Sequence, residues 1–376
     1  MKLFEYEAKE ILARYGITVP RGAVASSPVE VEEVAREIGG PVALKSQVLV
    51  AGRGKAGGIV FADNAVEAGK AATGLIGSDI KGSLVRQLLV EEKLDITREF
   101  YASVAVDRQA RRYVVLVSTE GGVDIEETAL ASPDKIARCW VDPITGFNKT
   151  GVEEELSGQL EIGREDAIGL ADIIATLYTV ALDCDAELVE LNPLGRTESG
   201  GMVAADARII IDDNALFRHP ELTDSAAVGF DDTTLEAEAR RSNLAYVDLD
   251  GDIGIVGNGA GLVMATLDLV YHFGGRPANF LDIGGGGSLD ITRKGVLLVM
   301  SRPEVKAVLV NILGGITRCD VVAQAVIEAL NESSVKKPVV VRMMGTNEAE
   351  GNRMLREAGI NSYPDMEKAI EEIVKL

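Results

Sequence analysis

The amino-acid sequence predicts an α/β protein in two parts, an antiparallel part followed by a parallel one. In the first part, strand patterns such as 98–106 and 113–118 are separated by short polar turns, and strands joined in this way pair antiparallel. In the second part, short apolar strands alternate with helical patterns, which is typical of a doubly wound parallel sheet. The polar stretch 214–243 separates the two patterns, so we expect one domain at 1–238 and another at 239–376.

Composition argues against several kinds of partner. The chain has 376 residues, 59 of them acidic and 38 basic, and its net charge of -21 argues against nucleic acid or an anionic membrane. No apolar run approaches the ~20 residues of a membrane span, and the amphipathic start lacks the pattern of a signal peptide, so we expect a cytoplasmic protein. The three cysteines lie far apart, which favours neither disulfides nor a zinc site. We expect Cys319 to be a small buried residue rather than a reactive thiol.

The N-terminal part begins with two helical patterns, at 4–15 and 28–38. A short strand that contains Lys45 follows, and then a glycine-rich segment, 51–58, which carries two basic residues. The backbone N–H groups of such a loop can approach an anion closely. The segment therefore predicts a phosphate-binding lid, and a flexible hairpin with solvated cations is an equally open alternative. It lacks the Walker pattern, so no P-loop is expected.

A second hairpin is predicted from the strand patterns at 187–192 and 202–207. Residues two apart on a strand share a face, so Glu190 and Asn192 point the same way and Asp206 on the partner strand can meet them. Such an all-oxygen cluster suits Mg²⁺, whose remaining ligands would be phosphate oxygens and water. An exposed polar face of the hairpin is the alternative, and both interpretations stay open at this point.

Four strand patterns in the C-terminal part each end in a polar, glycine-rich loop. They lie at 253–256, 279–283, 305–313 and 339–342. Ligands gather at the carboxyl ends of parallel strands, so we expect these loops to face one crevice. We also expect a helix to begin at Gly314 and Gly315, where free N–H groups and the helix dipole would attract an anion. An ordinary strand-to-helix turn is the alternative.

One further glycine run is weak evidence of a site. The Gly-Asn-Gly-Ala-Gly sequence at 257–261, with Asp282 at the end of the next strand, resembles a dinucleotide fingerprint only superficially. Its glycine spacing differs from that of the fingerprint, so a tight turn is the better interpretation.

Several motifs of the chain belong together. They are Leu-Phe-Glu-Tyr-Glu-Ala-Lys at 3–9, Gly-Arg-Gly-Lys-Ala-Gly-Gly at 52–58, Ser-Thr-Glu-Gly-Gly-Val at 118–123, Glu-Leu-Asn-Pro-Leu at 190–194, Asn-Ala-Leu-Phe-Arg at 214–218, Asn-Gly-Ala-Gly-Leu at 258–262, Pro-Ala-Asn-Phe-Leu-Asp at 277–282 and the segment 307–320. Together they resemble the β subunits of succinyl-CoA synthetase (succinate–CoA ligase), and the resemblance extends from one end of the chain to the other.

The resemblance implies an ATP-grasp domain followed by a flavodoxin-like CoA-ligase domain. It also implies an acid–thiol ligase that uses ATP or GTP with Mg²⁺ to convert succinate and CoA reversibly into succinyl-CoA, ADP or GDP, and phosphate, through a phosphohistidine. By resemblance, the nucleotide contacts are Lys45, Gly52, Arg53, Gly54, Glu91, Leu94 and Glu99, the Mg²⁺ ligands are Asn192 and Asp206, the substrate contacts are Asn258, Gly315, Ile316 and Thr317, and Glu190 is the carboxylate that steadies the phosphohistidine.

The histidines of the chain point to a partner. There are only two, His219 and His272, and both lie outside every phosphate-handling motif, so we expect both to be structural. The phosphorylated histidine is therefore expected on an α subunit, which by resemblance also holds most of the CoA site.

Three alternatives stay open. Thr317 stands where the common bacterial form has valine, and its extra hydroxyl leaves a malate–CoA ligase β subunit as the nearest alternative. A self-sufficient ATP-grasp ligase that joins a carboxylate to an amine would turn over without a partner. A nucleotide-binding or flavodoxin-like sensor would bind its ligand without transferring phosphate.

Overall fold

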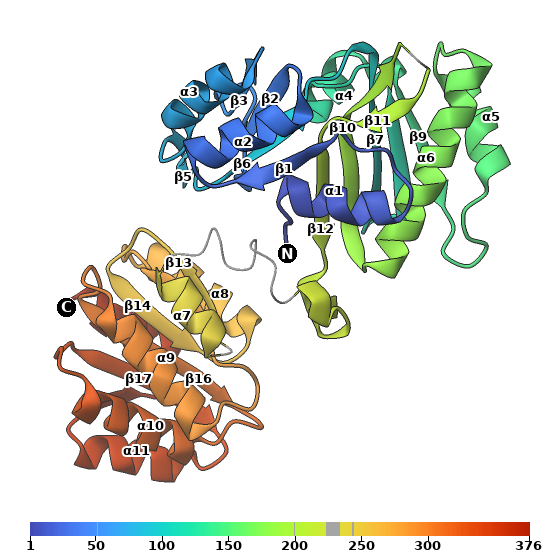
Figure 1. Cartoon of the computed structure of the whole chain (residues 1–376). Coiled ribbons are helices and arrows are strands. Elements are labelled where there is room, and N and C mark those ends of the chain that lie inside the picture. Colours follow the sequence, from blue (N-terminus) through green and yellow to red (C-terminus); the bar gives the residue numbers. More distant parts are fainter. Residues whose placement is uncertain (51, 199, 223–233, 243) are drawn as a thin grey trace. The chain divides into compact units, whose positions relative to one another are not determined.

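The computed structural model describes residues 1–50, 52–198, 200–222, 234–242 and 244–376 (Figure 1). Contacts between residues divide the chain into two units, Met1–Asp231 and Asp232–Leu376. The predicted boundary after residue 238 lies inside helix α7 (Thr234–Arg241), and it stays a prediction. Within the described ranges, no helix is both long and apolar enough to cross a membrane.

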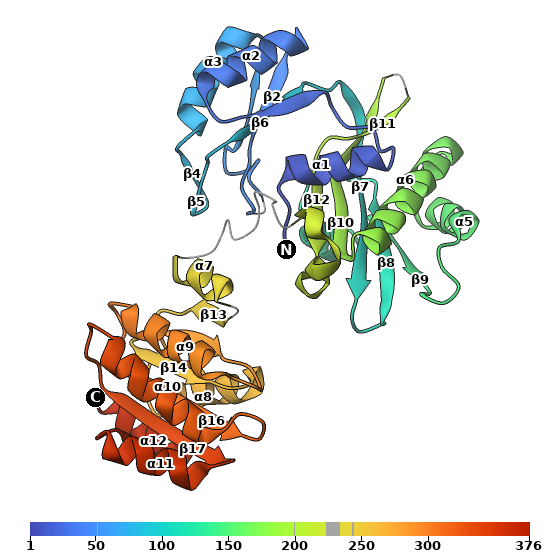
Figure 2. The same ribbon diagram turned by 60° about the horizontal axis from the view of Figure 1, so that its bottom comes forward.

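The first lobe of unit 1 contains β1 (Gly22–Ala25), α2 (Pro28–Ile38), β2 (Val42–Ser46), β3 (Ile59–Ala62), α3 (Ala65–Leu75), β4 (Asp79–Ile80), β5 (Ser83–Leu84) and β6 (Leu88–Glu92). Four of its strands form an antiparallel sheet in the order β1-β6-β2-β3. Helices α2 and α3 pack side by side against this sheet (Figure 2). Each helix begins at a side chain that accepts a backbone N–H, Ser27 for α2 and Asn64 for α3.

The second lobe contains α1 (Glu5–Arg14), β7 (Ile96–Asp107), β8 (Arg112–Ser118), α4 (Ile125–Ala131), η1 (Pro133–Lys135), β9 (Ile136–Val141), α5 (Lys149–Gln159), α6 (Arg164–Asp183), β10 (Ala186–Thr197), β11 (Met202–Ala204), β12 (Ala207–Ile211), η2 (Asp213–Arg218) and η3 (Pro220–Leu222). Its six strands are antiparallel, in the order β11-β10-β7-β8-β9 with β12 also on β10. Helices α1, α5 and α6 cover the sheet and share its apolar core. The predicted hairpin of β7 and β8 is confirmed.

The second predicted hairpin differs in its pairing. Strand β10 does not end at Asn192 but continues to Thr197, where it pairs with β11, while its first half pairs with β12. Glu190 therefore lies opposite Arg208 in the ladder, and Asp206 lies in the corner between β11 and β12. The predicted partner strand 202–207 was wrong because register depends on the whole sheet. The predicted turn includes residue 199, which lies outside the described residues.

Unit 2 contains α7 and β13 (Ala245–Asp248), β14 (Ile253–Gly257), α8 (Ala260–His272), β15 (Asn279–Asp282), α9 (Leu289–Ser301), β16 (Ala307–Gly314), α10 (Cys319–Glu332), β17 (Val339–Gly345), α11 (Glu348–Glu357), β18 (Asn361–Tyr363) and α12 (Met366–Val374). The strand order is β13-β15-β14-β16-β17-β18, and every pair is parallel except that of β13 with β15. The predicted doubly wound parallel sheet is confirmed.

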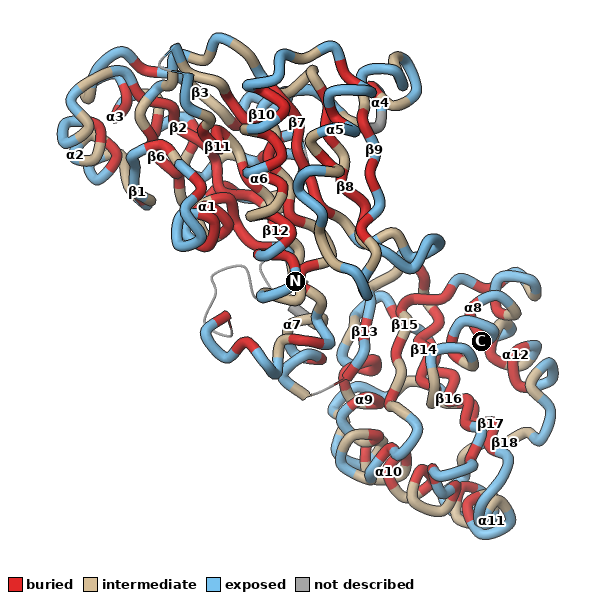
Figure 3. The backbone as a smooth tube through the Cα atoms, turned by 90° about the vertical axis from the view of Figure 1, so that its right-hand side faces the viewer, coloured by how far each residue is buried: buried red, intermediate tan, exposed pale blue. Residues whose placement is uncertain are grey.

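The parallel strands of unit 2 have the flavodoxin-like order 2-1-3-4-5 when they are numbered along the chain. Helices α8 and α12 share one apolar core with the sheet, and α9, α10 and α11 share another. Buried residues consequently follow the central strands (Figure 3). In this strand order the switch point lies between β14 and β16, where ligands of such folds bind.

Candidate functional site

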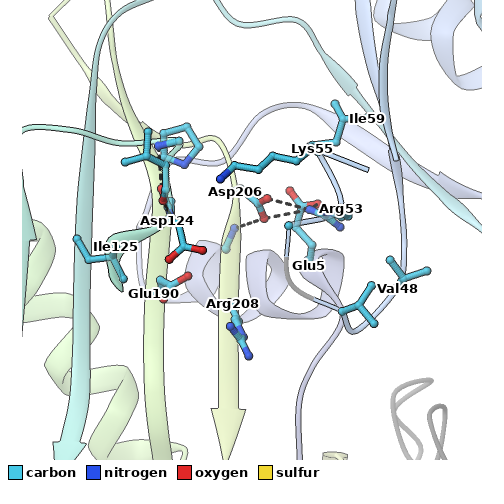
Figure 4. A pocket seen from close by; sticks show the side chains of 18 of the residues that line it. Glu5, Val48, Arg53, Lys55, Ile59, Asp124, Ile125, Glu190, Asp206 and Arg208 are labelled. Atoms are coloured by element: carbon cyan, nitrogen blue, oxygen red, sulfur yellow. Dashed lines mark hydrogen bonds and ion pairs between the residues drawn. The ribbon is translucent and has the colours of Figure 1, made fainter. Parts of the chain in front are cut away.

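Unit 1 contains a cleft of about 780 Å³ that both lobes line (Figure 4). The first lobe contributes the glycine-rich loop that follows β2, including Gly52, Arg53 and Gly54. The second lobe contributes residues of β10 and of the corner between β11 and β12. Gly52 has φ +70°, a left-handed conformation that favours glycine, and a Cβ there would lie 2.9 Å from the Lys81 Nζ.

The cleft brings together six of the residues predicted from the resemblance. These are Gly52, Arg53, Gly54, Glu190, Asn192 and Asp206. The other four predicted nucleotide or catalytic residues of unit 1 lie elsewhere. Lys45 and Glu91 are buried beside the cleft, Leu94 follows β6, and Glu99 is exposed on β7 near Gly122, a residue that does line the cleft. Their binding roles stay predictions.

Arg53 joins the glycine-rich loop to the opposite lobe. Its guanidinium forms an ion pair with Glu5 and lies 3.0 Å from each carboxylate oxygen of Asp206. It also donates to the Ser46 carbonyl oxygen at 3.0 Å. The guanidinium is nine-tenths buried, and the carboxylates of Asp206 and Glu5 raise the pKa of Arg53 further against the opposing effect of burial.

Behind Arg53 lie two lysines and two carboxylates. Lys45 Nζ is 3.0 Å from Glu5 Oε1 and 2.7 Å from Glu91 Oε2. Lys9 Nζ is 2.8 Å from Glu5 Oε1 and 2.6 Å from Glu91 Oε1. Burial alone would raise the pKa of Glu5, but the charges of Arg53, Lys45 and Lys9 outweigh it and hold that pKa well below its usual range. The neighbouring carboxylates likewise raise the pKa of Lys45 although burial opposes them.

Glu5 and Lys9 were not predicted as site residues. They stand four residues apart on α1, and i,i+4 pairs of opposite charge usually lie on an exposed helix face. Here Ala8 and Leu12, on the same face, are fully buried, so the pair lies within the apolar stripe. Charged residues inside the apolar stripe of a helix are the signal that could have found them. Arg208 was missed as well: it lines the cleft, and among the described residues no partner of its guanidinium is found.

Asn192 and Glu190 are held by the loop and strand next to them. Asn192 Oδ1 accepts the Gly122 N–H at 2.8 Å, and its Nδ2 donates to the Val123 carbonyl oxygen at 3.0 Å. The backbone N–H of Asn192 donates to the Asp206 carbonyl oxygen at 3.2 Å. Tyr101 donates its hydroxyl to Glu190 at 3.1 Å. Asn192 and Asp206 are thus neighbours that present hard oxygen atoms to one cleft, which fits the ligand preference of Mg²⁺.

The predicted substrate residues of unit 2 meet at the switch point. Asn258 follows β14, and its side chain holds the end of β16 by accepting the Leu313 N–H at 2.8 Å and donating to the Leu313 carbonyl oxygen at 3.0 Å. Its Nδ2 also lies 3.4 Å from the Thr317 Oγ1. Thr317 is buried, whereas Gly315 and Ile316 are exposed. The residues are brought together, and their contact with a substrate stays a prediction.

The helix after β16 begins later than predicted. Helix α10 starts at Cys319, not at the glycine pair, because β16 continues to Gly314 and residues 315–318 form a loop. The Gly315 N–H donates to the Leu313 carbonyl oxygen, and the Cys319 N–H donates to that of Thr346. The glycine pair therefore does not present the free helix amides that we expected. Cys319 is fully buried, as predicted, and burial raises the pKa of its thiol.

Asp282, His219 and His272 are the remaining residues singled out from the sequence. The Asp282 carboxylate accepts the N–H of Gly259 at 2.6 Å and that of Gly284 at 2.7 Å, so it joins two loops. His219 is buried and lies 2.8 Å from Asp185, and His272 ends α8. Neither histidine lines the cleft of unit 1.

Comparisons with known proteins agree on one family. A family model described as an ATP-grasp domain matches residues 2–196, and one described as CoA-ligase matches 256–374. The ADP-forming succinate–CoA ligase subunit β of Desulfurococcus amylolyticus is 51% identical, and the match covers 100% of this chain and 99% of that one. The GDP-forming subunit β of Thermus thermophilus is 48% identical over the same shares of both chains.

A solved structure shows the same fold at low identity. The ATP citrate lyase of Methanothrix soehngenii, in complex with citrate and coenzyme A, matches with a TM-score of 0.80 at 19% identity, covering 100% of this chain and 99% of that one. The order of the two matched domains equals that of units 1 and 2, and relatives of 51% and 48% identity match along the whole length. The chain therefore belongs to the family of succinate–CoA ligase β subunits, and it is a ligase.

Proposed function

We propose that this chain is the nucleotide-binding subunit of a two-subunit ligase that couples ATP or GTP to the formation of succinyl-CoA from succinate and CoA. The observation that supports this most is the cleft of unit 1, because it gathers the glycine-rich loop, the Asn192 and Asp206 oxygens and Glu190 around one space. Phosphoryl transfer requires chiefly placement and neutralisation of charge from a protein, and these residue types supply both.

Each residue of the cleft has a proposed role. Asn192 and Asp206 would hold Mg²⁺, which when bound neutralises charge on the nucleotide phosphates. Arg53 and Lys45 would bind phosphate oxygens, and the backbone of Gly52 and Gly54 would let the loop approach them. Leu94, Glu91 and Glu99 would complete the nucleotide contacts.

The phosphorylated histidine would come from an α subunit. Neither His219 nor His272 lines the cleft, which supports a donor on another polypeptide. Glu190 would accept a hydrogen bond from that imidazole and so orient it. In unit 2, Asn258, Gly315, Ile316 and Thr317 would contact the acid, and most of the CoA site would lie on the α subunit.

Incubation with γ-labelled ATP or GTP tests this proposal. The purified chain is compared with the chain plus an α subunit, and we expect label on a histidine of the partner only when both chains are present. Label or turnover with the isolated chain would instead indicate a self-sufficient ligase, and tight nucleotide binding with no transfer in either sample would indicate a sensor. A panel of acids assayed with the pair separates succinate from malate.

A further inference from the structure

Two buried lysines of unit 1 share the same three acceptors. Lys45 Nζ reaches Glu5, Glu91 and the Ala205 carbonyl oxygen at 3.0, 2.7 and 2.5 Å. Lys9 Nζ reaches the same three groups at 2.8, 2.6 and 2.8 Å. Every acceptor that Lys45 uses is therefore also bound by Lys9.

The two lysines belong to different lobes. Lys9 lies on α1, whose Ala8 and Leu12 are fully buried in the core of the second lobe. Lys45 lies on β2 of the first lobe and donates a hydrogen bond to Glu5. Glu5 also forms an ion pair with Arg53, which lines the cleft. The Ala205 carbonyl precedes Asp206, so the shared acceptors lie directly behind the cleft.

We propose that Lys9 is a positioning residue for nucleotide binding, because it keeps Glu5, Glu91 and the Ala205 carbonyl paired when Lys45 turns toward a phosphate. The inference rests on the proposed function, in which Lys45 and Arg53 are the phosphate-binding cations. Lys9 itself does not touch the nucleotide.

The charges of the cluster support this division of roles. Three cations, Lys9, Lys45 and Arg53, face three carboxylates, those of Glu5, Glu91 and Asp206. A nucleoside triphosphate with its Mg²⁺ adds negative charge, which Lys45 and Arg53 can balance by leaving their carboxylates. Glu5 and Glu91 then remain paired with Lys9, and Asp206 remains a ligand of the proposed metal.

Removal of Lys9 would trap Lys45. Leaving a buried carboxylate or carbonyl without a partner is costly, and the cost is largest for a buried charge. Without Lys9, the Lys45 ammonium is the remaining partner of Glu91 and of the Ala205 carbonyl. If Lys45 then turned toward a phosphate, both of these groups would be left unpaired. Nucleotide binding would then have to overcome that cost.

The test measures Lys9→Met in two backgrounds, the unmodified chain and Glu91→Gln. Dissociation constants of the Mg²⁺-bound nucleotide are measured by calorimetry on the full chain, and folding is checked by thermal unfolding. In the unmodified background we expect Lys9→Met to weaken binding on the order of tenfold or more. Measured against Glu91→Gln alone, the same change should weaken binding much less, because one of the two carboxylates that hold Lys45 then carries no charge. Glu10→Gln, an exposed carboxylate of the same helix, is the matched control and should bind as the unmodified chain does.

Two outcomes overturn the inference. Lys9→Met could bind nucleotide as tightly as the unmodified chain, or it could lose the same factor in both backgrounds, which would mean that Lys9 only supports the fold. Failure of the proposed function shows in a different experiment, the γ-label assay, where no label would reach a histidine of the α subunit whatever the nucleotide affinity of Lys9→Met. With the α subunit present, Lys9→Met should raise the KM for nucleotide while the KM for the acid stays unchanged.

Discussion

The buried Arg342 of unit 2 is balanced differently from the buried cations of unit 1. In unit 1, Lys9, Lys45 and Arg53 are each in ion-pair contact with buried or half-buried carboxylates. In unit 2, Arg342 on β17 is 9% exposed, and among the described residues its Nε has no hydrogen-bond partner and no carboxylate forms an ion pair with it. Its Nη1 lies 3.3 Å from the Asn311 Oδ1, a neutral acceptor on β16.

This difference shows how each unit positions its predicted site. In unit 1 the charged side chains share partners, so a ligand that binds one of them changes the ion pairs of the rest. Binding in the cleft is therefore coupled to the ion pairs between the lobes. In unit 2 the end of β16 at the switch point is held by neutral hydrogen bonds from Asn258, and the loop after β14 is held by the Asp282 carboxylate. The loss of one charge should therefore matter more in the cluster of unit 1 than at Arg342.

The sharpest test compares Glu5→Gln with Arg342→Met. Glu5→Gln leaves three buried cations with two carboxylates, and we expect it to lower the free energy of unfolding of unit 1 by about 3 kcal/mol. Arg342→Met removes a charge that has no counter-charge, so the free energy of unfolding of unit 2 should change by no more than about 1 kcal/mol. Chemical denaturation of the full chain measures both. Equal losses of unfolding free energy in Glu5→Gln and Arg342→Met would contradict this difference between the two places.

The next largest effect concerns Asp206→Ala. We expect Mg²⁺-dependent nucleotide binding to weaken on the order of 30-fold, because a carboxylate of the proposed metal site is lost. Asn192→Ala should act in the same direction. Calorimetry with and without Mg²⁺ measures the effect, and Asp134→Ala, which removes an exposed carboxylate of η1, is the control. If Asp206→Ala binds the nucleotide normally, the metal assignment is wrong.

Acid should weaken unit 1 through Glu5. Its pKa in the folded chain is lowered from the ordinary 4.5, chiefly because the charges of Arg53, Lys45 and Lys9 outweigh burial. The stability that Glu5 contributes is therefore present above about pH 4.5 and lost as the pH falls through the lowered value. Lys45 acts oppositely: its pKa is raised, so its contribution is present below its ordinary 10.5 and lost only above that. Unfolding followed against pH should show a smaller acid-induced loss in Glu5→Gln than in the unmodified chain.

The smallest effect is expected from Thr317→Val. This change removes a hydroxyl that lies 3.4 Å from Asn258, a weak contact, so the stability of unit 2 should fall by less than about 1 kcal/mol. Nucleotide binding in unit 1 should not change. Rates with succinate and with malate, measured with the α subunit, show whether the hydroxyl sets the choice of acid. An altered nucleotide affinity would contradict the separation of the two sites.

The sequence predicted most of the parallel unit. Each of its predicted strands is a largely apolar segment with a glycine within the three residues that follow it, a local signal that lies near the end of the strand. In unit 1, helix α2 likewise has the bounds that its proline start and glycine end predict. The order of the strands could not be read from these runs, because it depends on contacts between segments far apart in the chain.

The candidate site was predicted less completely, for two physical reasons. The position of Asp206 depends on the register of β10 against two partner strands, and register is a long-range property. Glu5 and Lys9 resemble an exposed helix pair until the surrounding burial is known. The later start of α10, at Cys319, follows from the pairing of Gly314 with Gly345, which extends β16 beyond the apolar run.

The corner between β11 and β12 limits which insertions and deletions the cleft can accept. Ala204 pairs with Leu194 and Ala207 pairs with Leu191, so Ala205 and Asp206 alone bridge the two ladders. Successive side chains of a strand face opposite sides, so one added or deleted residue at this step would turn Arg208 away from the cleft. Both the spacing of this corner and the carboxylate of Asp206, the proposed metal ligand, therefore have to be kept.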